Sequence, residues 1–118
     1  MPPPVVKFME VKTILDGSIA AWKAKHGRDP DLTGEHQDPN FGWATNQQLQ
    51  KATARGFQLI DKNMIGKTPG QGKDTNLVKA LRDPTGVDEL GQMPDNGPFL
   101  KAADIQKIID WIDGGCKD

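Results

Sequence analysis

The chain has 118 residues, of which 36% are hydrophobic and 26% charged, and its formal net charge is −1 at pH 7. This length supports one small domain, because a second hydrophobic core requires roughly 100 further residues. The balanced charge provides no positive field to hold a phosphate backbone, so nucleic acid is not expected as a partner. With 13 glycines and 9 prolines, the domain should be rich in loops around a thin core.

The two ends of the sequence set the boundaries of this domain. Residues 1–4, which read MPPP, are expected to be a linker stub, and residues 5–118 to form the single domain. Cys116 is the only cysteine, which excludes an intrachain disulfide and a thiolate metal cluster. No apolar run approaches the ~20 residues of a membrane-spanning helix, so membrane insertion is not expected.

The first expected element is a helix over residues 5–25. Its apolar residues recur mostly every three or four positions, which is the period of one buried helical face. Gly27 is a natural C-terminal stop for this helix. The residues of the apolar pattern are Val5, Phe8, Met9, Val11, Ile14, Leu15, Ile19 and Trp22.

A long loop is expected over residues 28–44, because prolines, glycines and polar residues interrupt every regular pattern there. Phe41 and Trp43 stand in this polar stretch, which is typical of a loop that covers core or ligand. Trp43 is also the candidate for an exposed contact with a sugar or a protein. A short helix, opened by a capping box at Thr45, is expected over residues 45–54.

The second half of the chain holds two further expected helices. An apolar stretch over residues 57–65 is open between a short strand and a turn. A helix follows over residues 76–82, and Asp83 with Pro84 ends it. The last helix, over residues 102–113, has isoleucines at i, i+3, i+4 and i+7 and a pair of glycines after it. Because no strand pair alternates at period two, the predicted fold class is all-α with long loops.

Two segments resemble class I c-type cytochromes. They are residues 93–100, which read MPDNGPFL, and residues 105–115, which read IQKIIDWIDGG. The likeness is closest to the small cytochrome c-like domains of planctomycete and related bacterial multidomain proteins, and it covers most of residues 8–116. The resemblance implies a cytochrome c-like bundle of about four helices, in a periplasmic or extracellular protein.

The haem-attachment motif of that family is absent from this chain. The family carries Cys-x-x-Cys-His in its opening helix, where two thiols bond to the haem vinyl groups and the histidine ligates iron. The matching positions here are Ser18, Ala21 and Trp22, which can form neither a thioether nor a bond to iron. We therefore expect no covalent haem, and we expect side chains, with Trp22 foremost, to refill the haem site.

One axial ligand of the family has a counterpart in this sequence. Met93 matches the methionine whose thioether suits haem iron. His26 follows Trp22 by about one helical turn, and it is the candidate partner of Met93 for a non-covalent haem.

An acidic stretch inside the expected loop resembles the first half of an EF-hand calcium loop. Alternate oxygen side chains converge on the ion in such a loop, and a glycine at the sixth position allows its sharp turn. The twelfth position here is Asn40, which lacks the bidentate carboxylate, so a solvated acidic loop is the favoured interpretation. The candidate calcium ligands are Asp29, Asp31, Thr33 and Glu35.

No constellation in the sequence indicates catalysis. Residues 66–75 resemble a phosphate-binding loop, but Lys73 is not followed directly by serine or threonine. Ser18 has no histidine at helical reach, and neither His26 nor His36 has a paired cysteine or thiolate. The chain is therefore not expected to be an enzyme.

The sequence favours a haem-free cytochrome c-like domain that serves as a binding or structural accessory module of a larger protein. No cofactor is expected, and the expected partner is a protein or the remainder of a multidomain chain. Electron transfer through a non-covalently bound haem is one alternative. A calcium- or carbohydrate-binding accessory domain is the other.

Overall fold

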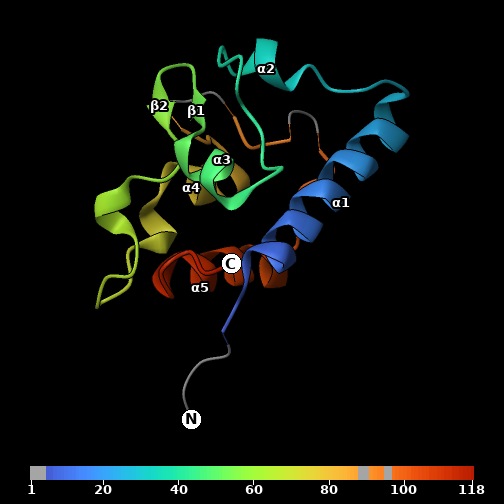
Figure 1. Cartoon of the computed structure of the whole chain (residues 1–118). Helices are drawn as coiled ribbons and strands as arrows, with labels where there is room; N and C mark the ends of the chain where they lie inside the picture. The colour runs from blue at the N-terminus through green and yellow to red at the C-terminus, as the bar shows by residue number, and fades with distance from the viewer. Residues whose placement is uncertain (1–4, 88–90, 95–96) are drawn as a thin grey trace.

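The computed structural model describes residues 5–87, 91–94 and 97–118. Over these residues the protein is mainly helical, as the sequence predicts (Figure 1). Its elements are α1 (Phe8–His26), α2 (Leu32–Glu35), α3 (Asn46–Lys51), β1 (Thr53–Ala54), β2 (Phe57–Gln58), the 3₁₀ turns η1 (Lys62–Met64) and η2 (Gly72–Asp74), α4 (Asn76–Arg82) and α5 (Ala102–Asp113).

Helix α5 is the centre of the packed core. Its apolar face is the one that the isoleucine spacing predicts, and Ile108, Trp111 and Ile112 are each 0% exposed. The helix packs against α1, α4 and η2, and Figure 1 shows it lying below α1 and α4. Burial of this one face therefore holds α1, from the start of the chain, and η2 and α4, from its middle, against the C-terminal helix.

The C-terminal tail closes the packed end of the molecule. The carbonyl oxygen of Lys117 accepts hydrogen bonds from the backbone nitrogen of Phe8 at 2.8 Å and from Nε1 of Trp111 at 2.9 Å. Cys116 is buried in the same apolar cluster, and burial raises the pKa of its thiol to about 12. The cysteine is therefore a protonated core side chain rather than a reactive thiolate.

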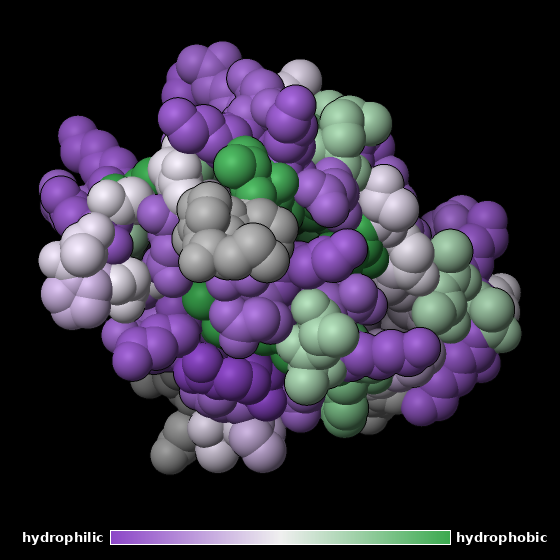
Figure 2. Space-filling model, turned by 90° about the horizontal axis from the view of Figure 1, so that it is seen from below, coloured by the Kyte–Doolittle hydropathy of each residue, from purple (hydrophilic) through white to green (hydrophobic). Residues whose placement is uncertain are grey.

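The outer surface at this end is mostly polar. Seen from below, the molecule shows hydrophilic side chains with hydrophobic atoms in small separate areas between them (Figure 2). This agrees with α5, in which Gln106 and Lys107 are exposed while Ile105, Ile108, Trp111 and Ile112 are buried. The packed end is an ordinary solvated surface over a dense core.

Two local predictions from the sequence are wrong. The helix expected over residues 45–54 ends at Lys51, because Ala52 turns to an extended conformation and β1 then pairs with β2 as an antiparallel hairpin. This pairing opens the apolar stretch over 57–65 with a short strand. The loop expected over residues 28–44 contains the single helical turn α2, which the Asp31 side chain caps. In both places a short hydrogen-bonded element forms that has no periodic signal in the sequence.

Candidate functional site

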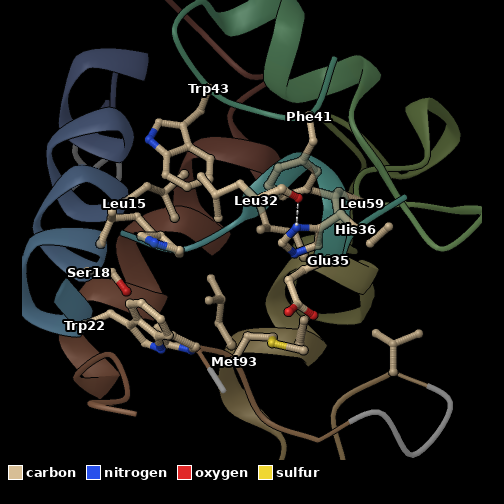
Figure 3. A pocket seen from close by; sticks show the side chains of 18 of the residues that line it. Leu15, Ser18, Trp22, Leu32, Glu35, His36, Phe41, Trp43, Leu59 and Met93 are labelled. Carbon is tan, nitrogen blue, oxygen red and sulfur yellow. Dashed lines mark hydrogen bonds between the residues drawn. The ribbon is translucent and has the colours of Figure 1, made fainter. Parts of the chain in front are cut away.

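A cavity of about 290 Å³ lies between the second half of α1, α2, the hairpin, α4 and residues 91–94 (Figure 3). Its volume is near the lower end of the roughly 300–1,000 Å³ that small-molecule sites occupy. The apolar part of its lining includes Leu15, Trp22, Leu32, Phe41, Trp43 and Met93.

Helix α1 forms one wall of the cavity. Leu15, Ser18, Ile19 and Trp22 line it, at spacings that place all four on one helical face. Trp22 is 8% exposed, and the Arg28 guanidinium lies over its ring, 5.2 Å from the centroid. The first half of α1 therefore packs mainly in the core, and its second half lines the cavity.

The facing wall is a group of aromatic rings from the polar loop. The His36 ring stacks on Phe41 with a centroid distance of 3.7 Å and an interplanar angle of 2°. Trp43 meets Phe41 edge to face, at 6.0 Å and 83°. Trp43 also donates from Nε1 to the Asp16 carboxylate at 2.8 Å, which fastens this wall to α1. Hydrogen bonds from Lys12 and then Trp43 lower the pKa of Asp16.

His36 has a fixed tautomer. Its Nδ1 lies 2.6 Å from the carbonyl oxygen of Leu32, and since a carbonyl can only accept, Nδ1 carries the proton. Burial lowers the pKa of His36 below its usual value, so the ring is neutral at pH 7. Its Nε2 is therefore unprotonated and can only accept a hydrogen bond. Figure 3 shows this nitrogen turned away from Leu32, toward the side of the cavity where Met93 lies.

Sequence reasoning missed His36 as a site residue. The loop around it has no hydrophobic period, and the stacking partner and the carbonyl that orient the ring depend on how the loop folds. The only signal was a pair of aromatic residues, Phe41 and Trp43, in a polar stretch.

Of the positions that the cytochrome resemblance singles out, three line the cavity. Ser18 and Trp22 line it from α1, and Met93 lines it from residues 91–94, beside Trp22 at the bottom of the view (Figure 3). Ala21 lies on the exposed face of α1 and does not belong to the lining. Trp22 stands in the wall, and a cavity remains beside it.

The donors required for haem are not brought together. The only thiol, Cys116, is buried in the α5 core cluster and is not part of the lining, so covalent attachment does not fit. His26 also lies outside the lining: its Nε2 is 3.0 Å from the Gly97 carbonyl oxygen, and its ring rests 4.3 Å from that of Trp22. The predicted pair of His26 and Met93 therefore does not fit haem iron in this arrangement.

The predicted calcium ligands make separate contacts. Asp31 caps α2, Asp29 pairs with Lys23 at 3.1 Å, and Glu35 lies 3.9 Å from an arginine of the hairpin turn, while Thr33 is exposed. Among the described residues, no group of three or more His, Cys, Asp or Glu side chains is placed to hold a metal ion. Calcium binding at this loop stays a prediction without geometric support.

Trp43 is placed differently from the expectation of an exposed contact. Its ring is partly buried, lines the cavity and is tied to α1 through Asp16. It is therefore part of the cavity wall, and carbohydrate binding stays a prediction.

Comparison with known proteins found no relative of this chain. Scans against protein-family models, curated proteins and solved structures each gave no match. In the described part of the chain, none of the helices combines the length and apolarity needed for a membrane crossing.

Proposed function

We propose that this chain is a cytochrome c-like domain without covalent haem that acts as a ligand-binding accessory module of a larger protein. The observation that carries the proposal is that Ser18, Trp22 and Met93 line one cavity. These are the positions that match the family's haem-attachment helix and its axial methionine. The binding site is the cavity between α1 and residues 91–94.

The chemistry of the lining supports a small apolar ligand. An engineered apolar cavity of about 150 Å³ holds benzene, so the volume of about 290 Å³ here suits a molecule of roughly two fused rings. Aromatic and thioether side chains gain dispersion contacts when such a ligand enters, because an empty cavity offers them no partner atoms. The ligand is thus selected by shape and apolarity.

The direct test is calorimetric titration with 2-methylnaphthalene, an apolar two-ring probe. The full chain is expected to bind it at one site. Ser18→Leu should weaken this binding by about tenfold or more, because the larger side chain projects from α1 into the cavity. The matched control is Ala20→Leu, which places the same side chain on the exposed face of α1 and should leave affinity unchanged.

Either of two results would overturn the proposal. The first is the absence of saturable heat when the wild-type protein is titrated with the probe. The second is binding of the probe by Ser18→Leu as tightly as by Ala20→Leu. The second result would place any binding outside the cavity.

Haem is tested separately with an absorption spectrum of the purified protein before and after addition of hemin. We expect the spectrum to remain that of free hemin, because Met93 has no His26 beside it in the lining. A sharp Soret band that disappears in Met93→Ala would contradict this and would support electron transfer instead.

A further inference from the structure

The polar groups that line the cavity differ in how they are used. Asp31 caps α2, and Glu35 lies beside Arg55. Arg28 lies over the ring of Trp22. Within the described residues, Nε2 of His36 forms no hydrogen bond, although Nδ1 of the same ring is bonded to the protein. The half-buried ring of His36 therefore presents an acceptor that is available to a ligand.

We propose that the occupant is an uncharged two-ring aromatic molecule with one hydroxyl group, and that this hydroxyl donates a hydrogen bond to Nε2 of His36. The inference rests on the proposed binding function and names the class of ligand for the same cavity. It assigns His36 as the residue that sets specificity.

The need for a donor follows from the orientation of His36. The Leu32 carbonyl fixes the proton on Nδ1, and the stack on Phe41 fixes the plane of the ring. Nε2 then presents a lone pair toward the cavity (Figure 3). A purely apolar ligand removes this nitrogen from water without replacing its hydrogen bond, which is unfavourable. A ligand hydroxyl restores the bond.

The absence of ligand charge follows from the same surroundings. A carboxylate cannot donate to Nε2, and its charge is repelled by the lone pair. An ammonium group can donate, but the lining is mostly apolar, and the nearby carboxylate of Glu35 already lies beside Arg55. A neutral hydroxyl satisfies the acceptor without burying a charge.

The aromatic character follows from the walls. Trp22 bounds the cavity on one side, and the stacked pair of His36 and Phe41, with Trp43 edge-on to Phe41, bounds it on the other. Flat rings gain contact with such surfaces at little conformational cost. The volume admits about two rings, as argued above.

The test compares 2-naphthol with 2-methylnaphthalene, in which a methyl group of similar size replaces the hydroxyl. In the full chain, 2-naphthol should bind about tenfold more tightly than 2-methylnaphthalene, after correction for their partition between water and hydrocarbon. His36→Phe keeps a ring against Phe41 and removes the acceptor, so this preference should fall to about one. Ala20→Leu is the control and should keep the preference.

A second measurement uses the wild-type protein alone. The ¹⁵N resonance of His36 Nε2 should shift when 2-naphthol is added and stay in place with 2-methylnaphthalene. Equal preference in the wild type and His36→Phe, or an unchanged Nε2 resonance with bound 2-naphthol, would overturn the inference while leaving cavity binding intact. Failure of both probes to bind would overturn the proposed function itself.

Discussion

The two halves of α1 belong to different environments. In the first half, Val11 is 0% exposed and packs in the cluster that α5 organises. In the second half, Trp22 borders a cavity of about 290 Å³. One continuous helix thus connects a closely packed region to a hollow one. Stability should therefore reside mainly around α5, and binding around Trp22.

The difference arises from what each half has to pack against. Around α5, a regular row of isoleucines and the C-terminal tail supply apolar surface from several directions. Over the second half of α1, the cover is a polar loop that contributes Phe41 and Trp43 and is held by the bond to Asp16. A loop of this composition encloses the space without filling it.

The largest expected effect compares two tryptophans. Trp111→Ala should lower the free energy of unfolding by about 3–5 kcal/mol, because it empties the densest part of the core and removes the bond to the Lys117 carbonyl. Trp22→Ala should cost less, about 1–3 kcal/mol, because its ring borders the cavity and gives up fewer packing contacts. Urea unfolding followed by circular dichroism measures both. A larger cost for Trp22→Ala would reverse the assignment of the two regions.

An intermediate effect is expected at two helix caps. Thr75, 1% exposed, donates from Oγ1 to the Gly72 carbonyl at 2.7 Å and caps α4, so Thr75→Ala should cost about 1–2 kcal/mol. Thr45 caps α3 at the exposed surface, and Thr45→Ala should cost about 0.5–1 kcal/mol. Thermal unfolding of the two variants makes the comparison. Equal losses would show that the packed region depends no more on its hydrogen bonds than the cavity side does.

The smallest expected effect is a dependence on pH. Burial lowers the pKa of His36 in the folded protein, so below pH of about 6.5 the unfolded chain takes up a proton that the folded chain does not. Stability should therefore fall as pH falls from about 6.5 toward that lowered pKa. The hydrogen bond to the Leu32 carbonyl, followed by Glu35 and Asp38, raises the pKa of His36 and so reduces the effect, whereas Arg55 lowers it further.

His36→Phe is the variant for this pH effect. The free energy of unfolding of this variant, measured from unfolding curves at several pH values, should fall less with decreasing pH than that of the wild type, because the His36 imidazole is absent. Binding of 2-naphthol should weaken over the same range, since a protonated Nε2 cannot accept. An acid sensitivity that is identical in His36→Phe would assign it to other groups.

Much of the packed region was predictable from the sequence. The isoleucine period gave the bounds of α5, and the cap and stop residues gave those of α4, both as the structure has them. These signals are local, so they need no knowledge of the tertiary fold. The hairpin and α2 were not predictable, because each is one short turn or pair stabilised by contacts across the loop.

The candidate site was predictable only in part. Ser18, Trp22 and Met93 were singled out from the sequence, and all three line the cavity. The cavity beside Trp22 was not predictable, because the volume between distant segments cannot be summed from residue types. His26 has the right spacing from Trp22 on the helix, yet its ring turns to the Gly97 carbonyl beyond the lining. His36 depended on a loop conformation with no periodic signal.

The three tryptophans provide the most direct test of the division between a packed and a binding region. Trp22 and Trp43 line the cavity, whereas Trp111 lies in the α5 core, and each indole N–H gives its own resonance in a ¹⁵N–¹H spectrum. On titration with 2-methylnaphthalene, the resonances of Trp22 and Trp43 should shift saturably while that of Trp111 stays in place. A shift of the Trp111 resonance alone, or no shift of any of the three resonances, would contradict the account.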